Sequence, residues 1–209
     1  MPSGSWALAL RRHSDRTERG VVMSQSQATE PAASSPYTYL PTVPSFQLSS
    51  ETVAGGAPLP IAQWSKLLGV PGGEDISPQL SWSGFPAETK SFVVSMYDPQ
   101  APTGSGFWHW VVADIPASVT SLCAGAGAAD AANLPDGAFQ LAGDAGAHQF
   151  VGAAPPPHSG IHNYYLTVTA LDIDTAGLDR NASAAYMGFA VAGHTIARAF
   201  IVCPTAAGE

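Results

Sequence analysis

Three side chains in this sequence have the chemistry to bind an anion or to transfer a proton, and each stands beside a stiff piece of backbone. Asp98 opens the sequence Asp-Pro-Gln-Ala-Pro, His109 lies between two tryptophans, and His162 follows a proline-rich loop. A proline fixes its own φ and restricts the residue before it, so such segments hold a neighbouring side chain in place. Each motif alone is more often a turn or a half-buried histidine. Their recurrence at three predicted strand ends favours one shared site.

One carboxylate and two imidazoles suit a small anion such as a phosphate ester. Protonated histidines donate hydrogen bonds to anion oxygens, and aromatic side chains hold a headgroup. The same groups could bind a metal as a facial triad, or a histidine could act as a general base in hydrolysis. The sequence has no HExxH motif and no Gly-x-Ser-x-Gly motif, and the look-alike at residues 81–84 lacks the first glycine. We therefore expect a binding site without a catalytic nucleophile, metal or cofactor.

The remaining histidines and the two cysteines add no predicted site. His148 and His158 lie in predicted loops and His194 in a predicted helix, so we interpret them as surface or hydrogen-bonded residues. Cys123 and Cys203 have neither metal-binding nor Cys-x-x-Cys spacing. We interpret them as reduced thiols of a cytoplasmic protein, with a single disulfide as the alternative.

Composition and charge exclude several classes of protein. The 209 residues are 45% hydrophobic and 11% charged, with 21 glycines and 18 prolines, which argues against a helical bundle. No apolar run reaches the ~20 residues needed to span a bilayer. The formal charge is −8, and half of the basic residues lie in the first 20 positions. The rest of the chain cannot supply the clustered cations that nucleic acids or anionic membranes require.

We expect residues 1–36 to be a disordered extension and residues 37–209 to form one domain. The short apolar stretch at residues 6–10 precedes the arginines, which is the reverse of a secretory signal. Residues 24–36 are a polar tail that cannot bury apolar area. Met23 is a second candidate for the first residue of the protein.

Short apolar runs separated by Gly, Pro, Asn and Asp predict β-strands. They lie at residues 46–48, 80–82, 91–97, 108–115 and 164–171. In the fourth run, alternation predicts that His109 shares a face with Phe107, with the two neighbouring tryptophans on the other face. Together the runs predict a β-sandwich or β-barrel.

Outside these runs, residues 123–148 are predicted to be a long loop, and one helix is predicted at about residues 182–199. Asn181 or Ser183 would cap this helix, and Gly188 and Gly193 are candidate breaks.

Three motifs, in their order along the chain, resemble the phosphatidylethanolamine-binding protein family and its bacterial branch of Raf-kinase-inhibitor-like proteins. The family has Asp-Pro-Asp-Ala-Pro, then Trp-His-His or Trp-His-Trp, then a Gly-x-x-Pro-Pro segment ending in His-Arg-Tyr. These correspond to residues 98–102, 108–110 and 152–164. Residues 77–82 also match the family's Ser-Pro-x-Leu-x-Trp strand, and the resemblance runs from about residue 44 to residue 204.

The resemblance implies a mainly β fold, with two antiparallel sheets packed as a sandwich, peripheral helices and a small anion pocket. The family's ligand-site residues correspond to Asp98, Ala101, Pro102, Phe107, His109, Gly152, Pro155, Pro156, His162 and Tyr164. The implied function is non-catalytic binding of a phosphate-bearing small molecule or phospholipid headgroup, with regulation of a partner protein left open. Inhibition of a kinase or serine protease, and metal- or His-dependent hydrolysis, are the alternatives. A homodimer is also left open.

The sequence departs from the family pattern at three positions near this site. Gln100 replaces the second Asp of the first motif, Asn163 replaces the Arg of the third, and His158 stands where Gly is common. The first two changes together remove one negative and one positive charge. We therefore expect the pocket to be kept with an altered affinity.

Overall fold

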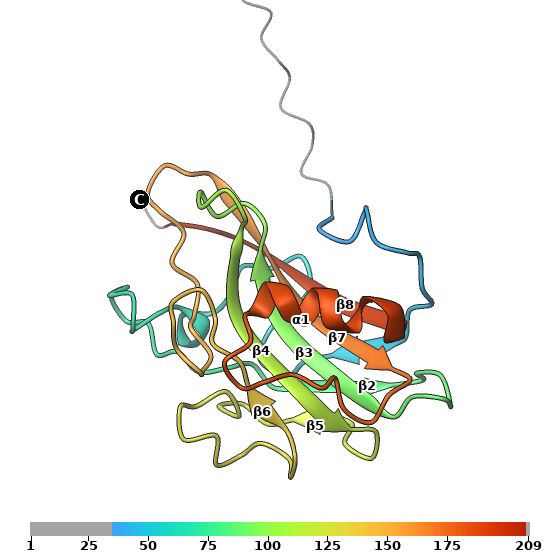
Figure 1. Cartoon of the computed structure of the whole chain (residues 1–209). Coiled ribbons are helices and arrows are strands. Elements are labelled where there is room, and N and C mark those ends of the chain that lie inside the picture. Colours follow the sequence, from blue (N-terminus) through green and yellow to red (C-terminus); the bar gives the residue numbers. More distant parts are fainter. Residues whose placement is uncertain (1–34, 208–209) are drawn as a thin grey trace, which may run out of the picture. The chain divides into compact units, whose positions relative to one another are not determined.

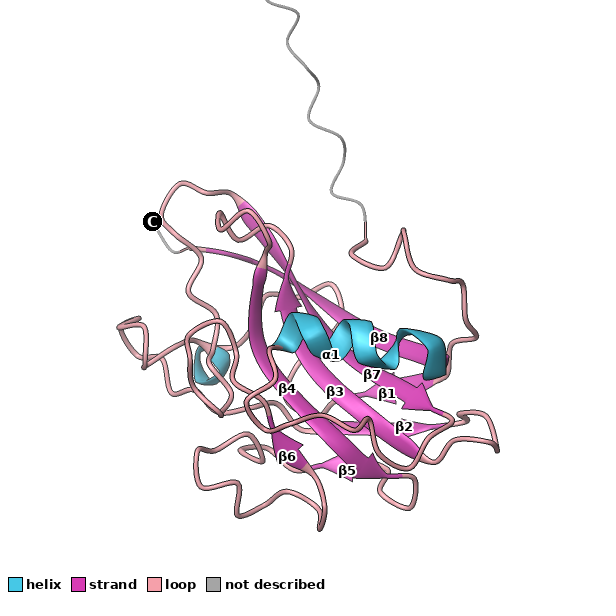
Figure 2. Ribbon diagram, in the orientation of Figure 1, coloured by secondary structure: helices cyan, strands magenta, loops and turns pink. Residues whose placement is uncertain are grey.

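The five apolar runs of the sequence form five of the strands of two antiparallel sheets in the computed structural model, which describes residues 35–207 (Figures 1 and 2). The larger sheet has the strand order β6 (Phe139–Gln140), β4 (Phe107–Pro116), β3 (Ser91–Asp98), β7 (Ile161–Leu171) and β8 (Thr195–Ala206). The smaller sheet has the order β1 (Gln47–Ser49), β2 (Leu80–Ser83) and β5 (Ser121–Leu122). This arrangement confirms the predicted fold class. A short 3₁₀ turn, η1 (Ile61–Gln63), precedes β2.

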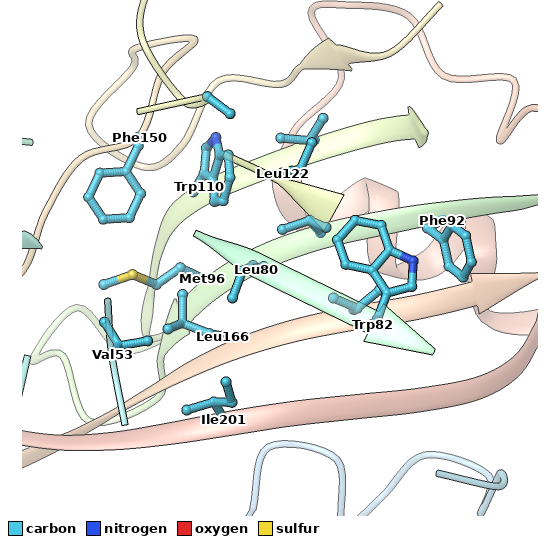
Figure 3. Close-up of a cluster of buried hydrophobic side chains, with 14 of the residues drawn as sticks. Val53, Leu80, Trp82, Phe92, Met96, Trp110, Leu122, Phe150, Leu166 and Ile201 are labelled. Atoms are coloured by element: carbon cyan, nitrogen blue, oxygen red, sulfur yellow. The ribbon is translucent and has the colours of Figure 1, made fainter. Parts of the chain in front are cut away.

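The main hydrophobic core is built from side chains of both sheets (Figure 3). Leu80 and Trp82 of β2 belong to the same buried cluster as Phe92 and Met96 of β3 and Leu166 of β7. The rings of Trp82 and Phe92 meet edge to face, with centroids 5.4 Å apart. Burying each such side chain stabilises the fold by about 1.5–3 kcal/mol. This core supports the strands from which the predicted site residues project.

A second apolar cluster covers the opposite face of the five-stranded sheet. Helix α1 (Ala184–Val191) lies across that face and buries Met187 against residues that include Val93 of β3 and Val111 of β4 (Figure 2). The Ser183 hydroxyl accepts a hydrogen bond from the N–H of Tyr186, so Ser183 is the N-cap, as expected. Within the described part of the chain, no helix is long and apolar enough to cross a membrane.

The predicted helix at residues 182–199 is wrong in its second half. Helix α1 ends at Val191, a 3₁₀ turn η2 (Ala192–His194) follows, and β8 begins at Thr195. From Ala197 to Thr205 every second residue is buried, which is the period of a strand rather than a helix. The alanines of this segment favour a helix locally, but pairing with β7 along the length of β8 overrides that preference.

A β-bulge at His109 changes the faces of the two tryptophans. Met96 of β3 pairs with Trp110, while the next residue, Tyr97, pairs with Trp108, so His109 is an extra residue on β4. Trp110 therefore lies in the main core, whereas Trp108 packs against Tyr97 with ring centroids 4.4 Å apart. The prediction that both tryptophans share one face is wrong, because strict alternation does not survive the extra residue.

The predicted disordered extension lies outside the described residues except for Ser35 and Pro36. The Ser35 carbonyl accepts a hydrogen bond from the N–H of Thr38 at 3.0 Å. Tyr37 then packs on the five-stranded sheet, where its hydroxyl lies 2.6 Å from Thr167 Oγ1 and the Arg198 guanidinium lies 4.7 Å from its ring centroid. The predicted boundary between the extension and the domain, at residue 37, stays a prediction. Tyr37 is the large side chain at this boundary that the sheet holds.

The two cysteines are free thiols in different surroundings. Cys123 is exposed and Cys203 is buried, so the alternative of a disulfide between them is wrong. Burial raises the pKa of the Cys203 thiol to about 11. The Cys203 side chain therefore behaves as a small apolar residue of the core.

Candidate functional site

The three predicted site residues come together where their strands end. Asp98 is the last residue of β3, His162 is the second residue of β7, and the bulge turns His109 of β4 toward them. Asp98 Oδ2 lies 2.7 Å from His162 Nδ1. The Tyr164 ring packs near both imidazoles, with its centroid 5.2 Å from that of His109 and 6.4 Å from that of His162. The Phe107 ring lies 4.8 Å from that of His109, which confirms their predicted common face.

The Asp98 carboxylate is buried and uses both oxygens. Oδ1 accepts a hydrogen bond from the N–H of Gln100 at 2.9 Å, and Oδ2 accepts from His162 Nδ1–H. The side chains of Asp98 and His162 are only 3% and 1% exposed. A buried carboxylate needs such partners, because it loses its hydration on folding. Asp98 therefore fixes both the first turn after β3 and the orientation of the His162 ring.

The hydrogen bonds of His109 determine its tautomer. Its Nδ1 lies 2.9 Å from the Val151 carbonyl oxygen and 3.1 Å from that of Gly152. Both partners are acceptors, so Nδ1 carries the proton and donates. Burial lowers the pKa of His109 below its ordinary value, because a charged imidazolium is poorly solvated there. At neutral pH His109 thus presents a lone pair at Nε2, which corrects the expectation of a protonated donor at this position.

Burial of neutral His109 predicts that the protein becomes less stable in mild acid. In the unfolded chain a histidine takes up a proton below about pH 6.5. Native His109 resists protonation in the window below that value, so the unfolded state binds more protons there. The free energy of unfolding should therefore fall as the pH decreases through this window. Urea unfolding at pH 7.5, 6.5 and 5.5 should show a smaller change in the His109→Gln variant. Equal changes in the parent and in the His109→Gln variant would contradict the conclusion that His109 is buried in its neutral form.

Gly152 is held between two segments that sequence reasoning did not connect. A Cβ at this position would lie 2.4 Å from the backbone carbonyl carbon of Trp64, so only glycine fits. The Gly152 N–H donates to Asp75 Oδ1 at 2.7 Å, and the other oxygen of Asp75 accepts from the N–H of Leu67 at 2.7 Å. Asp75 thus positions the backbone that holds His109. The sequence analysis missed it, although Asp75 stands two residues before the matched Ser-Pro-x-Leu-x-Trp segment.

The proline-rich loop brings a hydroxyl group to His162. Ser159 Oγ lies 2.8 Å from His162 Nε2 and donates a hydrogen bond to the Pro156 carbonyl oxygen at 2.6 Å. Ser159 was not among the predicted site residues. His158, just before it, has φ 64°, in the left-handed region that favours glycine. This conformation accounts for the glycine that the family commonly has at this position.

Two of the three positions that depart from the family pattern, Gln100 and Asn163, contact each other. The Gln100 side-chain oxygen accepts a hydrogen bond from the backbone N–H of Asn163 at 2.8 Å. A neutral side chain thus joins the loop after β3 to the start of β7. Relative to the family pattern, these two substitutions remove one negative and one positive charge beside the site. The hydrogen bond that joins the two segments runs between an amide oxygen and a backbone N–H.

The other predicted site residues belong to the loops around this group. Pro155 is buried, Ala101 is partly exposed, and Pro102 and Pro156 are exposed. Of these four, Pro156 is linked to the His162 imidazole through Ser159. Within residues 35–207, no three His, Cys, Asp or Glu side chains are grouped so that they could hold a metal ion.

A groove of about 640 Å³ lies on the three-stranded sheet, and none of the predicted site residues lines it. Its walls come from β1, β2 and residues 120–121, with Phe46 and Trp82 as the aromatic members. No ionisable side chain is among them. We therefore place the candidate site at the strand ends, where polar groups of defined protonation meet.

Two buried side chains can still form hydrogen bonds at this site. His109 and Tyr164 are 3% and 1% exposed. His109 Nε2 is not among the buried side-chain atoms without a hydrogen-bond partner and is paired by none of the contacts above, so this tip is open to solvent. The Tyr164 hydroxyl oxygen accepts a hydrogen bond from the backbone N–H of Ala154 and keeps its own proton to donate. Burial raises the pKa of Tyr164, which keeps it a phenol that can donate. The site thus offers a donor and an acceptor on neighbouring rings.

Comparisons with known proteins identify similar chains. The family model described as "Phosphatidylethanolamine-binding protein" matches residues 49–205. The UPF0098 protein YbcL of Escherichia coli strain K12 is 42% identical over 164 residues, which cover 78% of this chain and 89% of YbcL. The UPF0098 protein YbhB of the same strain is 50% identical over 129 residues, which cover 62% of this chain and 80% of YbhB.

Solved structures agree with these sequence comparisons. The crystal structure of E. coli YbcL, described as a new member of the mammalian PEBP family, has a TM-score of 0.75 and 41% identity, covering 78% of this chain and 99% of that one. A structure described as that of a phosphatidylethanolamine-binding protein homologue from Chlamydia trachomatis has a TM-score of 0.64 and 27% identity, with coverage of 78% and 99%.

Proposed function

Because the chain belongs to the phosphatidylethanolamine-binding protein family, we propose that it binds a phosphate-bearing small molecule or phospholipid headgroup at Asp98, His109, His162 and Tyr164. The observation that carries the proposal is the pair of polar tips on two neighbouring buried rings, the unpaired Nε2 of His109 and the hydroxyl proton of Tyr164. Buried side chains whose polar tips can still donate or accept suit a ligand that completes their hydrogen bonds.

The protonation states of these groups indicate which form of a phosphate ester they suit. The Tyr164 hydroxyl can donate to a charged phosphate oxygen, and neutral His109 Nε2 can accept from a protonated one. A phosphate monoester carries both kinds of oxygen when it is singly charged, which is the main form below its second pKa of about 6. A phosphate monoester is therefore bound as a monoanion, and its binding weakens as the pH rises above that value, whereas a phosphodiester headgroup has no such second pKa.

Calorimetric titration with O-phosphoethanolamine at pH 5.5 and 7.5 tests this proposal. We expect the Tyr164→Phe and His109→Gln variants each to lose about 1–3 kcal/mol of binding free energy, the scale of a hydrogen bond involving a charged group. The His158→Ala variant, which changes an exposed loop histidine, is the matched control and should bind like the parent. Unchanged binding in both site variants would reject the site. Titration with vesicles containing phosphatidylethanolamine separates a lipid headgroup from a free phosphate ester.

The cytoplasm is the compartment that fits the proposal, and the two free thiols support it. Disulfides and other oxidised thiols are rare in that compartment, whereas an exposed cysteine such as Cys123 is vulnerable to oxidation elsewhere. Recovery of the protein in a periplasmic or secreted fraction would argue against this assignment.

A further inference from the structure

Three side chains at the site form one continuous hydrogen-bonded chain. Asp98 Oδ2 lies 2.7 Å from His162 Nδ1, and His162 Nε2 lies 2.8 Å from Ser159 Oγ. The first two residues are buried, whereas Ser159 is exposed to solvent. A carboxylate that orients an imidazole, and an imidazole within hydrogen-bond reach of a hydroxyl, is the arrangement that activates a serine nucleophile. Such a triad is recognised by its geometry and not by sequence spacing, so no sequence motif marks it.

The loop holds the serine in one place. The Ser159 N–H donates to the Pro156 carbonyl oxygen at 3.2 Å, within a run of three prolines at residues 155–157. On either side of the serine, His158 and Gly160 have φ values of 64° and 83°, so the backbone turns sharply there. Gly160 is the residue that follows Ser159, and its N–H donates to no backbone or side-chain oxygen of residues 35–207. In other serine enzymes the N–H after the nucleophile stabilises the oxyanion.

The protonation of His162 decides where the serine proton points. The Ser159 hydroxyl has one proton and two acceptors within reach, the Pro156 oxygen at 2.6 Å and His162 Nε2 at 2.8 Å. When His162 is neutral, Asp98 keeps its proton on Nδ1, so Nε2 accepts from Ser159. When His162 is charged, Nε2–H donates to Ser159 Oγ, and the hydroxyl proton turns to Pro156. The neutral form is the one in which the hydroxyl is poised for attack.

We propose that Ser159 is a catalytic nucleophile toward carboxylic esters, with His162 as its general base and Asp98 as the residue that orients the base. Ser159 Oγ forms a bond to the carbonyl carbon while its proton moves to His162 Nε2. The bond between that carbon and the alcohol oxygen then breaks, and His162 returns the proton to the departing alcohol. Water attacks the acyl-serine by the same proton route, which releases the acid and restores Ser159. This activity goes beyond headgroup binding and needs no phosphate on the substrate.

A fluorophosphonate probe tests the nucleophile directly, because the serine oxygen bonds to phosphorus and fluoride leaves. The full chain should gain one probe mass, located at Ser159 by peptide mass spectrometry, and should hydrolyse p-nitrophenyl acetate. Ser159→Ala should lose both reactions. Asp98→Asn should slow labelling by about 100-fold or more, since the imidazole loses the partner that fixes its tautomer. Ser105→Ala, which changes another exposed loop serine, is the matched control and should react like the parent.

Two results would overturn the proposal: a folded parent chain that takes up no probe at Ser159, or ester hydrolysis at the parental rate in Ser159→Ala. Because Ser159 lies on an exposed loop, that variant is expected to unfold at the parental temperature, which a melting curve checks. O-phosphoethanolamine binding by Ser159→Ala keeps the two proposals separate. If Ser159→Ala binds O-phosphoethanolamine but is not labelled, both proposals are supported. If the parent chain binds O-phosphoethanolamine but is not labelled at Ser159, only the proposed nucleophile is rejected.

Discussion

The Asp98→Asn substitution is expected to lower the free energy of unfolding by about 1–3 kcal/mol or more, the cost of leaving a buried donor without its acceptor. The carboxylate accepts hydrogen bonds from His162 Nδ1–H and from the N–H of Gln100. An amide has only one oxygen, so its NH₂ group must face one of these two donors. The buried donor that loses its acceptor cannot turn to water, and that loss is the source of the cost.

Urea unfolding followed by circular dichroism measures this effect. Asp144→Asn is the matched control, because Asp144 also accepts a backbone hydrogen bond, from Trp108 at 2.8 Å, but is exposed. The single oxygen of the amide can still accept this one hydrogen bond, and water reaches the exposed NH₂ group, so the expected change is about 1 kcal/mol or less. Similar losses in the two variants would show that burial of Asp98 does not set its contribution.

The Gly152→Ala substitution is expected to destabilise the fold by about 3 kcal/mol or more. The new methyl group would lie 2.4–2.6 Å from the backbone carbon and oxygen of Trp64 and the backbone oxygen of Gln63. All three are main-chain atoms, so no side-chain rotation relieves the contact. The shift that follows would also move the Gly152 N–H away from Asp75 and its carbonyl oxygen away from His109.

Gly188→Ala provides the control for this prediction. A methyl group at Gly188 meets nothing within 4 Å, and the position lies inside helix α1. Replacing a helical glycine with alanine stabilises by about 0.5–1 kcal/mol where the new methyl group has room. The two Gly→Ala changes should therefore shift the urea midpoint in opposite directions. A Gly152→Ala protein as stable as the parent would mean that the approach of the two backbones is looser than described.

The strands that the sequence predicts correctly are those whose own side chains prefer a sheet. Residues 91–97 and 164–171 are rich in β-branched and aromatic side chains, so local preference and tertiary pairing agree. Strand β8 was missed because its alanines favour a helix, and its partner β7 lies outside any local window. The faces of the tryptophans were missed because one extra residue in a strand leaves no mark on the hydrophobic pattern.

The same distinction applies to the site. The pairing of Asp98 with His162 could be predicted, because both stand in motifs at strand ends. Asp75 and Ser159 could not be predicted in the same way. Asp75 acts on Gly152 from 77 positions away, and the role of Ser159 depends on a turn whose shape is set by its neighbours. Polar residues in loops acquire their partners through tertiary structure, which a single sequence does not display.

The bulge at His109 also limits how this protein can change during evolution. Substitution of Trp108 or Trp110 by another apolar side chain alters packing at one point on one face of the sheet. Deletion of a single residue between Phe107 and Trp110 would instead remove the extra position and exchange inner and outer faces along one part of β4. Proteins descended from this one can therefore change the residue types in this segment far more freely than its length.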